Sequence, residues 1–344
     1  MLRKLNQMTT TTRKLNQVRN SFYVYLPRNW CDEFKLTKDS EVRIERTLEG
    51  TLRIIPPSIE SSQSEPLRLS LTRDQTKDIV NLLVGAYIVG TNEVELEFDD
   101  GLDMSTRGEI SKWIRRLPGF EILDEHSKSF ILSDTSEKQV ITPILRRQFA
   151  TTKYMLNGLL SMIESGNTSD HSRIIDRDED VDRHRYFVER LCHIVLRDPS
   201  YARRIALTPP DALSFSLAAK YVERIADHIC SAINELVQLK KLSPRLQKMA
   251  KAIISVYEDT SKTFFSIDTT RKSVQKLDIA ASSEKAQHTL KEATKLAEDL
   301  QKVGSSRKDK TPHEIVLALH LERIASYCAD IVEIGINRII ESAL

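Results

Sequence analysis

The sequence predicts a mixed multidomain protein, with a strand-rich N-terminal segment, a small α+β domain and an all-α pair of three-helix bundles. Alternating apolar residues, typical of strands, dominate residues 1–57, and strand and helix patterns alternate over residues 66–136. The tetrapeptide Glu-Arg-Ile-Ala occurs at Glu223–Ala226 and again 99 positions later at Glu322–Ala325, each time in a long amphipathic stretch without proline. This spacing is too long for a small solenoid unit and indicates a duplicated helical bundle.

The composition is that of an ordinary soluble protein, with 40% apolar residues, 29% charged residues and too little glycine and proline for extended disorder. A Pro-Pro step and a Ser/Glu-rich run predict a linker after the first strands. The predicted domains are a strand-rich segment (residues 1–57), a linker (58–65), an α+β domain (66–136), a first bundle (137–241) and a second bundle (242–344).

The N-terminal segment contains short strand patterns around one short helix. Ser21–Leu26 is rich in aromatic and branched residues and predicts a strand that Pro27 ends. Pro27–Phe34 suits one or two helical turns, and alternation predicts further strands within Glu41–Glu45 and Thr51–Ile55. So few strands in about 45 residues cannot bury a core alone, so we expect a homodimer.

Basic residues are concentrated in the same segment. The whole chain has a net charge of +2, yet residues 1–57 carry eleven Lys or Arg against six Asp or Glu, and residues 1–31 contain no acid. Arg3–Gln7 repeats as Arg13–Gln17, and we expect the first copy to be a frayed arm and the second to start the first strand. A local positive excess is typical of a surface that binds an anionic partner, and a solvated basic tail is the alternative.

The middle domain is expected to form a sheet with two helices. Strands are predicted at Leu67–Leu71 and Glu93–Phe98, and a hairpin at Phe120–Leu132. Thr72 with Gln75, and Ser105, are the expected helix caps, at the end of the first strand and after the second. Glu95 and Glu97 are expected to face solvent and to form no site.

Each bundle is expected to hold three long antiparallel helices, because the connections between them are short. Prolines at the first helical position mark two helix starts, after Thr208 and Thr311. The six predicted helices span about 139–165, 170–197, 209–240, 244–266, 268–303 and 311–342.

Four carboxylates are candidates for a metal site. Asp178 and Asp182 lie four residues apart on one helix, and Glu223 and Asp227 repeat this spacing on another. If the two faces meet, the acids repel one another, and a hard cation would offset both that repulsion and the cost of burial. No equivalent cluster is expected in the second bundle, where Ser326 stands in place of Asp227.

The alternative is that neighbouring arginines pair with these acids as surface ion pairs. The candidates are Arg177, Arg183 and Arg224. Single histidines near the acidic helices are expected to be core or surface residues rather than ligands; these are His184, His193 and His228.

Several functional classes are disfavoured. No phosphate-binding loop, serine-hydrolase elbow or zinc-protease motif occurs, so we predict no catalytic residues and no enzyme. The four cysteines lack zinc-site spacing. No apolar run approaches the roughly 18 residues of a membrane span, and no signal-peptide core is present, so a cytoplasmic protein without membrane insertion is expected.

The N-terminal pattern resembles SpoVT/AbrB-type swapped-hairpin domains. The likeness rests on Val18–Ser21, Leu26–Trp30 and Leu36–Val42. It implies a dimeric, interleaved β-barrel whose basic loops bind DNA, and it points to five DNA-binding candidates: Arg13, Lys14, Arg19, Asn20 and Arg28. Arg19 departs from the family by standing where glycine is usual, and Asp39-Ser40 replaces the common Gly-Asp turn. A module that dimerises without binding DNA is the alternative.

The C-terminal half resembles the PhoU family of phosphate-uptake regulators. The likeness rests on Ile174–Arg183 with the following Tyr186-Phe187, and on the duplicated Glu-Arg-Ile-Ala helix. It implies metal clusters built from Asp/Glu-x-x-x-Asp pairs, which Asp178, Asp182, Glu223 and Asp227 match, with iron, zinc, manganese or magnesium as the ion. An AbrB-like segment before PhoU-like repeats is associated with archaeal regulators.

Together these resemblances predict a dimeric, DNA-binding transcriptional regulator of phosphate uptake. The alternative is an adaptor that binds a phosphate transporter or a signalling protein, with the N-terminal segment serving only to dimerise.

Overall fold

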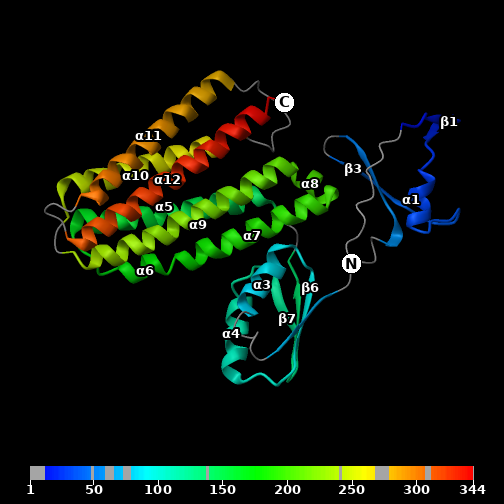
Figure 1. Cartoon of the computed structure of the whole chain (residues 1–344), viewed down its shortest axis with the longest axis horizontal. Coiled ribbons are helices and arrows are strands. Elements are labelled where there is room, and N and C mark those ends of the chain that lie inside the picture. Colours follow the sequence, from blue (N-terminus) through cyan, green and yellow to red (C-terminus); the bar gives the residue numbers. More distant parts are fainter. Residues whose placement is uncertain are drawn as a thin grey trace. The chain divides into compact units, whose positions relative to one another are not determined.

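The computed structural model describes residues 12–47, 50–58, 66–72, 79–136, 139–239, 242–267, 279–306 and 311–343 (Figure 1). The chain forms two compact units, Met1–Glu65 and Pro66–Leu344, and each is described by itself. The first copy of the short N-terminal repeat and the predicted capping residue Gln75 lie outside the described residues.

The first unit contains two antiparallel hairpins and one short helix. Strand β1 (Asn16–Val18) pairs with β2 (Ser21–Tyr23), and β3 (Arg43–Arg46) pairs with β4 (Leu52–Ile55). Helix α1 (Arg28–Glu33) confirms the predicted helical turns. In the described part of one chain the strands form two separate two-stranded sheets and no closed barrel, so a barrel completed by a second chain stays a prediction.

This unit leaves most of its apolar side chains uncovered. Leu15, Phe22, Tyr25 and Leu52 are each about two-thirds exposed, whereas Ile55 is buried. Two-stranded sheets are marginally stable alone.

Arg19 adopts a left-handed backbone conformation, with a φ of 54°, at the first central position of the β1–β2 turn. Glycine is favoured where φ is positive because it has no Cβ, so arginine at this position carries backbone strain that glycine would relieve. We expect Arg19→Gly to raise the free energy of unfolding by about 1 kcal/mol relative to Arg19→Ala, which removes the same charge but keeps the strain. Urea denaturation of both variants measures the difference; equal stability would contradict the argument.

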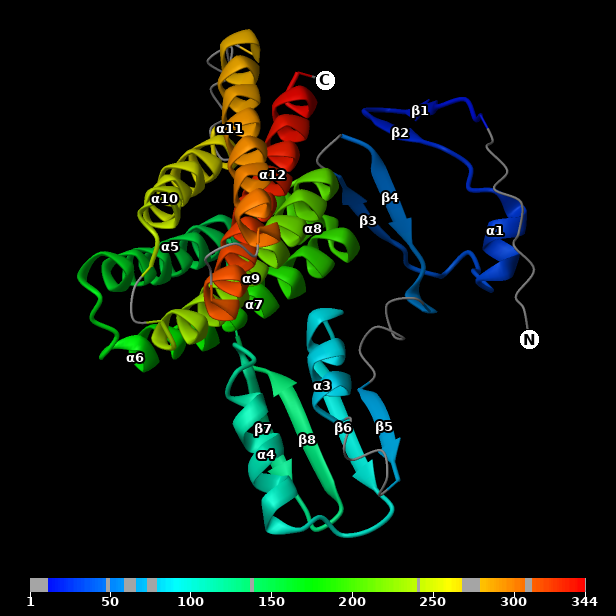
Figure 2. The same ribbon diagram turned by 60° about the vertical axis from the view of Figure 1, so that its left-hand side comes forward.

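The second unit begins with a four-stranded sheet covered by two helices. Its elements are β5 (Leu67–Leu71), α3 (Ile79–Ile88), β6 (Glu93–Phe98), α4 (Met104–Ile114), β7 (Phe120–Glu125) and β8 (Ser129–Asp134). The strand order is β5-β6-β8-β7, with β5 parallel to β6 and the other pairs antiparallel (Figure 2). The predicted hairpin is confirmed.

Two further expectations concern the exposure of Glu95 and Glu97 on the sheet and the residue that caps α4. Glu97 is exposed, and Glu95 pairs with Arg68 at 2.9 Å, as expected for a solvated strand face. The expectation that Ser105 caps α4 is wrong. Asp103 is the cap, because its Oδ1 accepts a hydrogen bond from the Thr106 amide at 2.7 Å.

The helical part contains six long helices and two short ones among the described residues. The first three long helices are α5 (Ile141–Ser165), α7 (Asp178–Arg197) and α9 (Pro209–Val237), and the next three are α10 (Pro244–Phe264), α11 (Ile279–Ser305) and α12 (Pro312–Glu341). The short helices are α6 (His171–Ile175) and α8 (Pro199–Ile205). The predicted starts after Thr208 and Thr311 are confirmed, and each threonine accepts a hydrogen bond from the third helical residue.

The single helix predicted over residues 170–197 is wrong, because it breaks at Asp176–Arg177 into α6 and α7. Ile174 of α6 packs directly on Gly158 of α5, where an added Cβ would approach the Ile174 side chain to 2.4 Å. This tertiary contact holds α6 against α5, and periodicity along the chain carries no signal of it.

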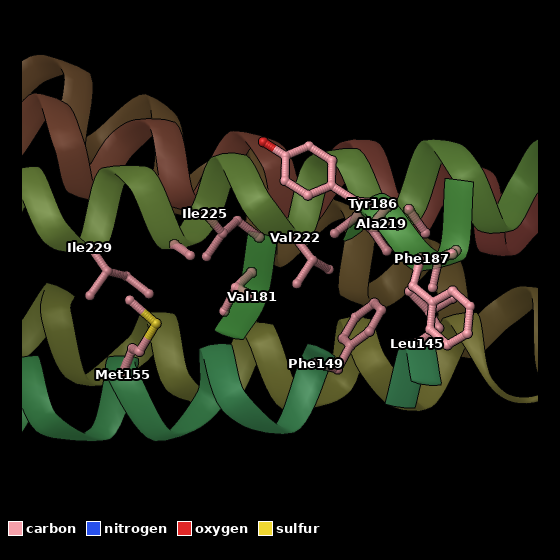
Figure 3. Packing of buried hydrophobic residues seen from close by; sticks show 14 of the residues in the cluster. Leu145, Phe149, Met155, Val181, Tyr186, Phe187, Ala219, Val222, Ile225 and Ile229 are labelled. Carbon is pink, nitrogen blue, oxygen red and sulfur yellow. The ribbon is translucent and has the colours of Figure 1, made fainter. Parts of the chain in front are cut away.

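The helices share one apolar core with the sheet domain. Figure 3 shows its centre, where Phe149 and Met155 of α5 lie opposite Val222 and Ile229 of α9. Phe149 also stacks on Phe264 of α10 with ring centres 5.9 Å apart, which joins the two bundles.

Arg190 of α7 joins the bundle to the sheet domain. Its side chain is fully buried and donates hydrogen bonds to the carbonyls of Tyr87 and Thr91 at 2.6 and 2.9 Å. It pairs with Asp134 at 2.6 Å and lies over the rings of Tyr87 and Phe120. One charged side chain thus holds three separate segments of the sheet domain on α7.

Candidate functional site

The four predicted metal-site carboxylates lie at the N-terminal half of α7 and the middle of α9. Burial raises the pKa of Asp178 to about 7, and repulsion from Asp182, Asp227 and Glu223 adds to this rise. Burial likewise raises the pKa of Asp182 and of Asp227. The two faces therefore come close enough for all four acids to interact electrostatically.

Arg185 is the main counter-charge for this cluster. Its Nε lies 3.4 Å from Glu223 and 3.9 Å from Asp182, and its Nη1 lies 3.2 Å from Glu189. The Arg185 side chain is nearly buried. Sequence reasoning missed it, although its position three residues after Asp182, on the same helical face, is a usable signal.

Of the three arginines expected to pair with the four carboxylates, only Arg224 does so in the described residues. Arg224 lies 3.6 Å from Glu223 and 3.5 Å from Asp227, as the alternative predicted. Arg177 instead pairs with Asp180 at 2.8 Å. No ion pair of Arg183 with the four carboxylates is seen within the described ranges.

Two oxygens of this cluster accept no hydrogen bond, Asp178 Oδ1 and Glu223 Oε2, and both are buried. Arg224 Nε, at 3.6 Å, is an ion-pair partner of the Glu223 oxygen. A buried oxygen without a hydrogen bond costs free energy unless a proton or a cation satisfies it. Arg116, two residues after the end of α4, is the cation that lowers the pKa of Asp178, and its Nε pairs with Glu179 at 2.8 Å. The sheet domain thus reaches the acidic cluster.

As the side chains stand, no three His, Cys, Asp or Glu residues in the described part of the chain lie in metal-holding geometry. The buried oxygens without a hydrogen bond and the raised pKa of Asp178 nevertheless suit a cation. Binding one would require Arg185 and Arg224 to turn away from Glu223.

In the second copy of the tetrapeptide, the carboxylate of Glu322 is hydrogen-bonded by a residue of the same helix. Ser326 donates a hydrogen bond to Glu322 at 2.8 Å.

The five DNA-binding candidates are all exposed in the first unit. Arg19 and Asn20 form the two-residue turn between β1 and β2, while Arg13 and Lys14 precede β1. Arg28 starts α1 and makes one exposed ion pair, with Asp32 at 3.6 Å, so most of its side chain stays free for an anion.

A second polar arrangement joins the bundles along α9 and α12, which lie side by side (Figures 1 and 2). Three contacts recur at steps of seven residues in opposite chain directions: Glu235 with His313 at 2.7 Å, His228 with His320 at 3.0 Å, and Tyr221 stacked on Tyr327 at 5.7 Å. The two Glu-Arg-Ile-Ala copies lie between the last two contacts. The duplicated tetrapeptide therefore marks the antiparallel helix pair that joins the two bundles.

His228 is half-buried and paired with a second histidine, His320, whereas the sequence predicts a single core or surface histidine. Burial, with contributions from His320, Arg323 and Arg224, lowers the pKa of His228 to about 4, and burial also lowers the pKa of His320. Both imidazoles are therefore neutral at neutral pH. His320 is 92 residues away from His228 in the sequence, which explains why no local pattern revealed the pair.

None of the helices in the described ranges combines the length and the apolar composition that a membrane span needs. No curated protein matches the chain. A crystal structure of the phosphate transport system regulatory protein PhoU from Streptococcus pneumoniae aligns with a TM-score of 0.44 and 18% identity, covering 59% of this chain and 94% of that one. Residues 145–236 match the family model described as the PhoU domain, so the acidic cluster lies in a segment that is similar to PhoU domains.

Proposed function

We propose that this protein is a dimeric regulator of phosphate uptake that binds DNA through its N-terminal unit. The PhoU-domain match over residues 145–236 supports the phosphate part of the proposal. The DNA part rests on one observation, namely that an acid-free stretch presents exposed basic side chains around a hairpin turn. Exposed Arg and Lys neutralise phosphates and supply most of the affinity for duplex DNA.

The dimer is proposed because the first unit leaves its apolar side chains uncovered. Phe22 and Leu52 project from short strands, and Tyr25 follows β2 by two residues. In the described part of one chain each of these strands pairs on one side only. A second copy of the unit can pair with those edges and bury these side chains, and the basic turns of both copies would then share one assembly.

Fluorescence anisotropy with duplex DNA tests this proposal. We expect binding that weakens steeply with salt, and a loss of at least about 100-fold when Arg13, Lys14, Arg19 and Arg28 are all changed to Ala, because a dimer then loses eight charges. The matched control changes four exposed basic residues of the helical part to Ala: Arg245, Lys285, Lys291 and Lys295.

Two outcomes separate the proposal from its alternative. Equal losses in both quadruple variants would show that binding follows net charge alone. A wild-type dimer that binds no DNA at low salt would leave the adaptor hypothesis, in which the bundle docks on a phosphate transporter or signalling protein and the first unit only dimerises.

We also propose that Asp178, Asp182, Glu223 and Asp227 hold one cation that stabilises the packing of α7 on α9. The buried oxygens of Asp178 and Glu223 that accept no hydrogen bond support this. Because all four ligands are carboxylates, magnesium, manganese and iron suit the site better than zinc. The ion would offset repulsion, and no catalytic role is proposed.

A further inference from the structure

The two edge strands of the four-stranded sheet differ in how well they are protected from pairing with another strand. β7 carries a bulge between Ile122 and Asp124 and three exposed acids, which are devices that keep edge strands from pairing. β5, at the opposite edge (Figure 2), has no bulge, proline or lysine over Leu67–Leu71 and pairs only with β6 in the described part of the chain. We propose that β5 is an interaction surface for a second copy of this chain, whose own β5 adds to it in antiparallel orientation.

The sequence of β5 is complementary to itself when one copy is turned end for end. An antiparallel pair centred on Leu69 places Leu69 of one copy opposite Leu69 of the other, Leu67 opposite Leu71, and Arg68 opposite Ser70. All opposed leucines then lie on the core side of the sheet, and all opposed polar residues lie on the other side. A slip of one residue would oppose leucine to Arg68 or Ser70, so the register is specified.

The core side of this edge is incompletely covered in one chain. Leu67 is 36% exposed and Leu69 is partly buried, whereas Val94 and Leu96, their neighbours on β6, are fully buried. A second β5 would continue these apolar rows and remove the remaining leucine surface from water. The backbone N–H and C=O groups on the free side of β5 would gain partners in the same step.

The polar side of β5 supplies charge complementarity. Arg68 pairs with Glu95 of its own chain at 2.9 Å, yet its side chain stays 70% exposed. Glu97 accepts a hydrogen bond from Ser70 at 3.2 Å, and no cation pairs with it among the described residues. In the proposed register Arg68 of one copy lies opposite Ser70 of the other, one strand away from that copy's Glu97, so the guanidinium can reach this carboxylate. Symmetry makes two such contacts.

This interface does not depend on the dimer proposed for the first unit, because all its residues lie in the second unit. The contact is isologous and therefore closes with two copies. Each β5 gains one neighbour, and the joined sheet keeps only the two protected β7 strands as its edges.

Disulfide cross-linking of the full-length protein tests the register. Directly opposed residues of antiparallel strands have Cα atoms about 4.5–5.5 Å apart, which a disulfide can span. We therefore expect Leu69→Cys, in a Cys31→Ser background that removes one partly exposed native thiol, to form a covalent dimer on mild oxidation. Leu67→Cys is the matched control, because its two copies would lie about 14 Å apart along the strands and should not cross-link.

Arg68→Glu tests the charge contacts. Added to the Leu69→Cys chain, it should slow cross-linking at least about fivefold, because the dimer loses both contacts to Glu97 and gains like charges there. Lys291→Glu makes the same charge change at an exposed position of α11 and should leave the rate unchanged. Equal rates in these two variants would overturn the proposed register.

Cysteines on the exposed side of β5 cover the case in which Leu69→Cys does not fold. A chain with Arg68→Cys and a chain with Ser70→Cys should cross-link when they are co-expressed, because these residues are opposed, and neither chain should cross-link alone. Cross-linking of Leu67→Cys as fast as that of Leu69→Cys, or no covalent dimer from either Leu69→Cys or the co-expressed pair, would overturn the proposal. The assay reports on β5 whether or not the first unit dimerises or binds DNA.

Discussion

Replacing Arg190 with methionine should lower the free energy of unfolding of the second unit by about 3–5 kcal/mol. Methionine keeps most of the side-chain volume but removes every donor of this fully buried group. Asp134 then keeps a largely buried charge without its 2.6 Å partner, and the carbonyls of Tyr87 and Thr91 lose their hydrogen bonds. Unpaired buried groups cost their full desolvation free energy.

Urea denaturation measures the loss, and hydrogen exchange of α3 (Ile79–Ile88) shows whether the sheet domain loosens from α7. Arg183→Met, at an exposed position two turns earlier on the same helix, is the control and should change stability little. Adding Asp134→Leu to Arg190→Met should recover part of the loss, because no unpaired charge remains. A loss below about 1 kcal/mol in the single variant would show that Arg190 does not hold the domains together.

Asp178→Asn should stabilise the protein above pH 7. The pKa of Asp178 is about 7 in the folded chain and 3.8 as the ordinary value, so the folded state binds a proton more tightly than the unfolded state between these values. Stability from this group is fully present below about pH 4 and is lost as pH rises through 7. Because the side chain is only partly buried, solvent screening reduces the effect to about 1–2 kcal/mol.

Thermal unfolding from pH 4 to 8 checks this result. The wild-type melting temperature should fall across the range more than that of Asp178→Asn, and the exposed Asp176→Asn should behave as wild type. Magnesium or manganese added at pH 8 should raise the melting temperature of the wild type and not that of Asp178→Asn. If the ions act equally on both proteins, the carboxylate cluster is not their site.

Local signals in the sequence predicted most helices and strands. The helix starts after Thr208 and Thr311 and the hairpin of β7 and β8 depend on residues only a few positions apart, and each is seen in the structure. Two predictions were wrong, one because a tertiary contact decided the structure and one because a residue close by in the sequence serves as the cap instead. The break at Asp176 accompanies packing of Ile174 on Gly158, and Asp103 lies only two residues before the expected cap.

For the candidate metal site, too, some contacts could be predicted from the sequence and others depend on how the elements pack. Spacing along single helices placed Asp178 with Asp182 and Glu223 with Asp227, because residues four apart share a helical face. The same spacing places Arg185 near Asp182 on α7. That Arg185 also meets Glu223 of α9, and that Arg116 of the sheet domain acts on Asp178, became clear only once the elements were packed together.

By itself, the sequence determined that the helical half is duplicated, where α9 and α12 start, and that positive charge gathers at the N-terminus, since repeats, proline positions and composition are properties of contiguous residues. Only the tertiary structure decided that Arg190 joins the two domains of the second unit and that His228 meets His320. Each of these contacts joins residues some 56 to 103 positions apart. Such pairs depend on how helix faces pack, which no local period encodes.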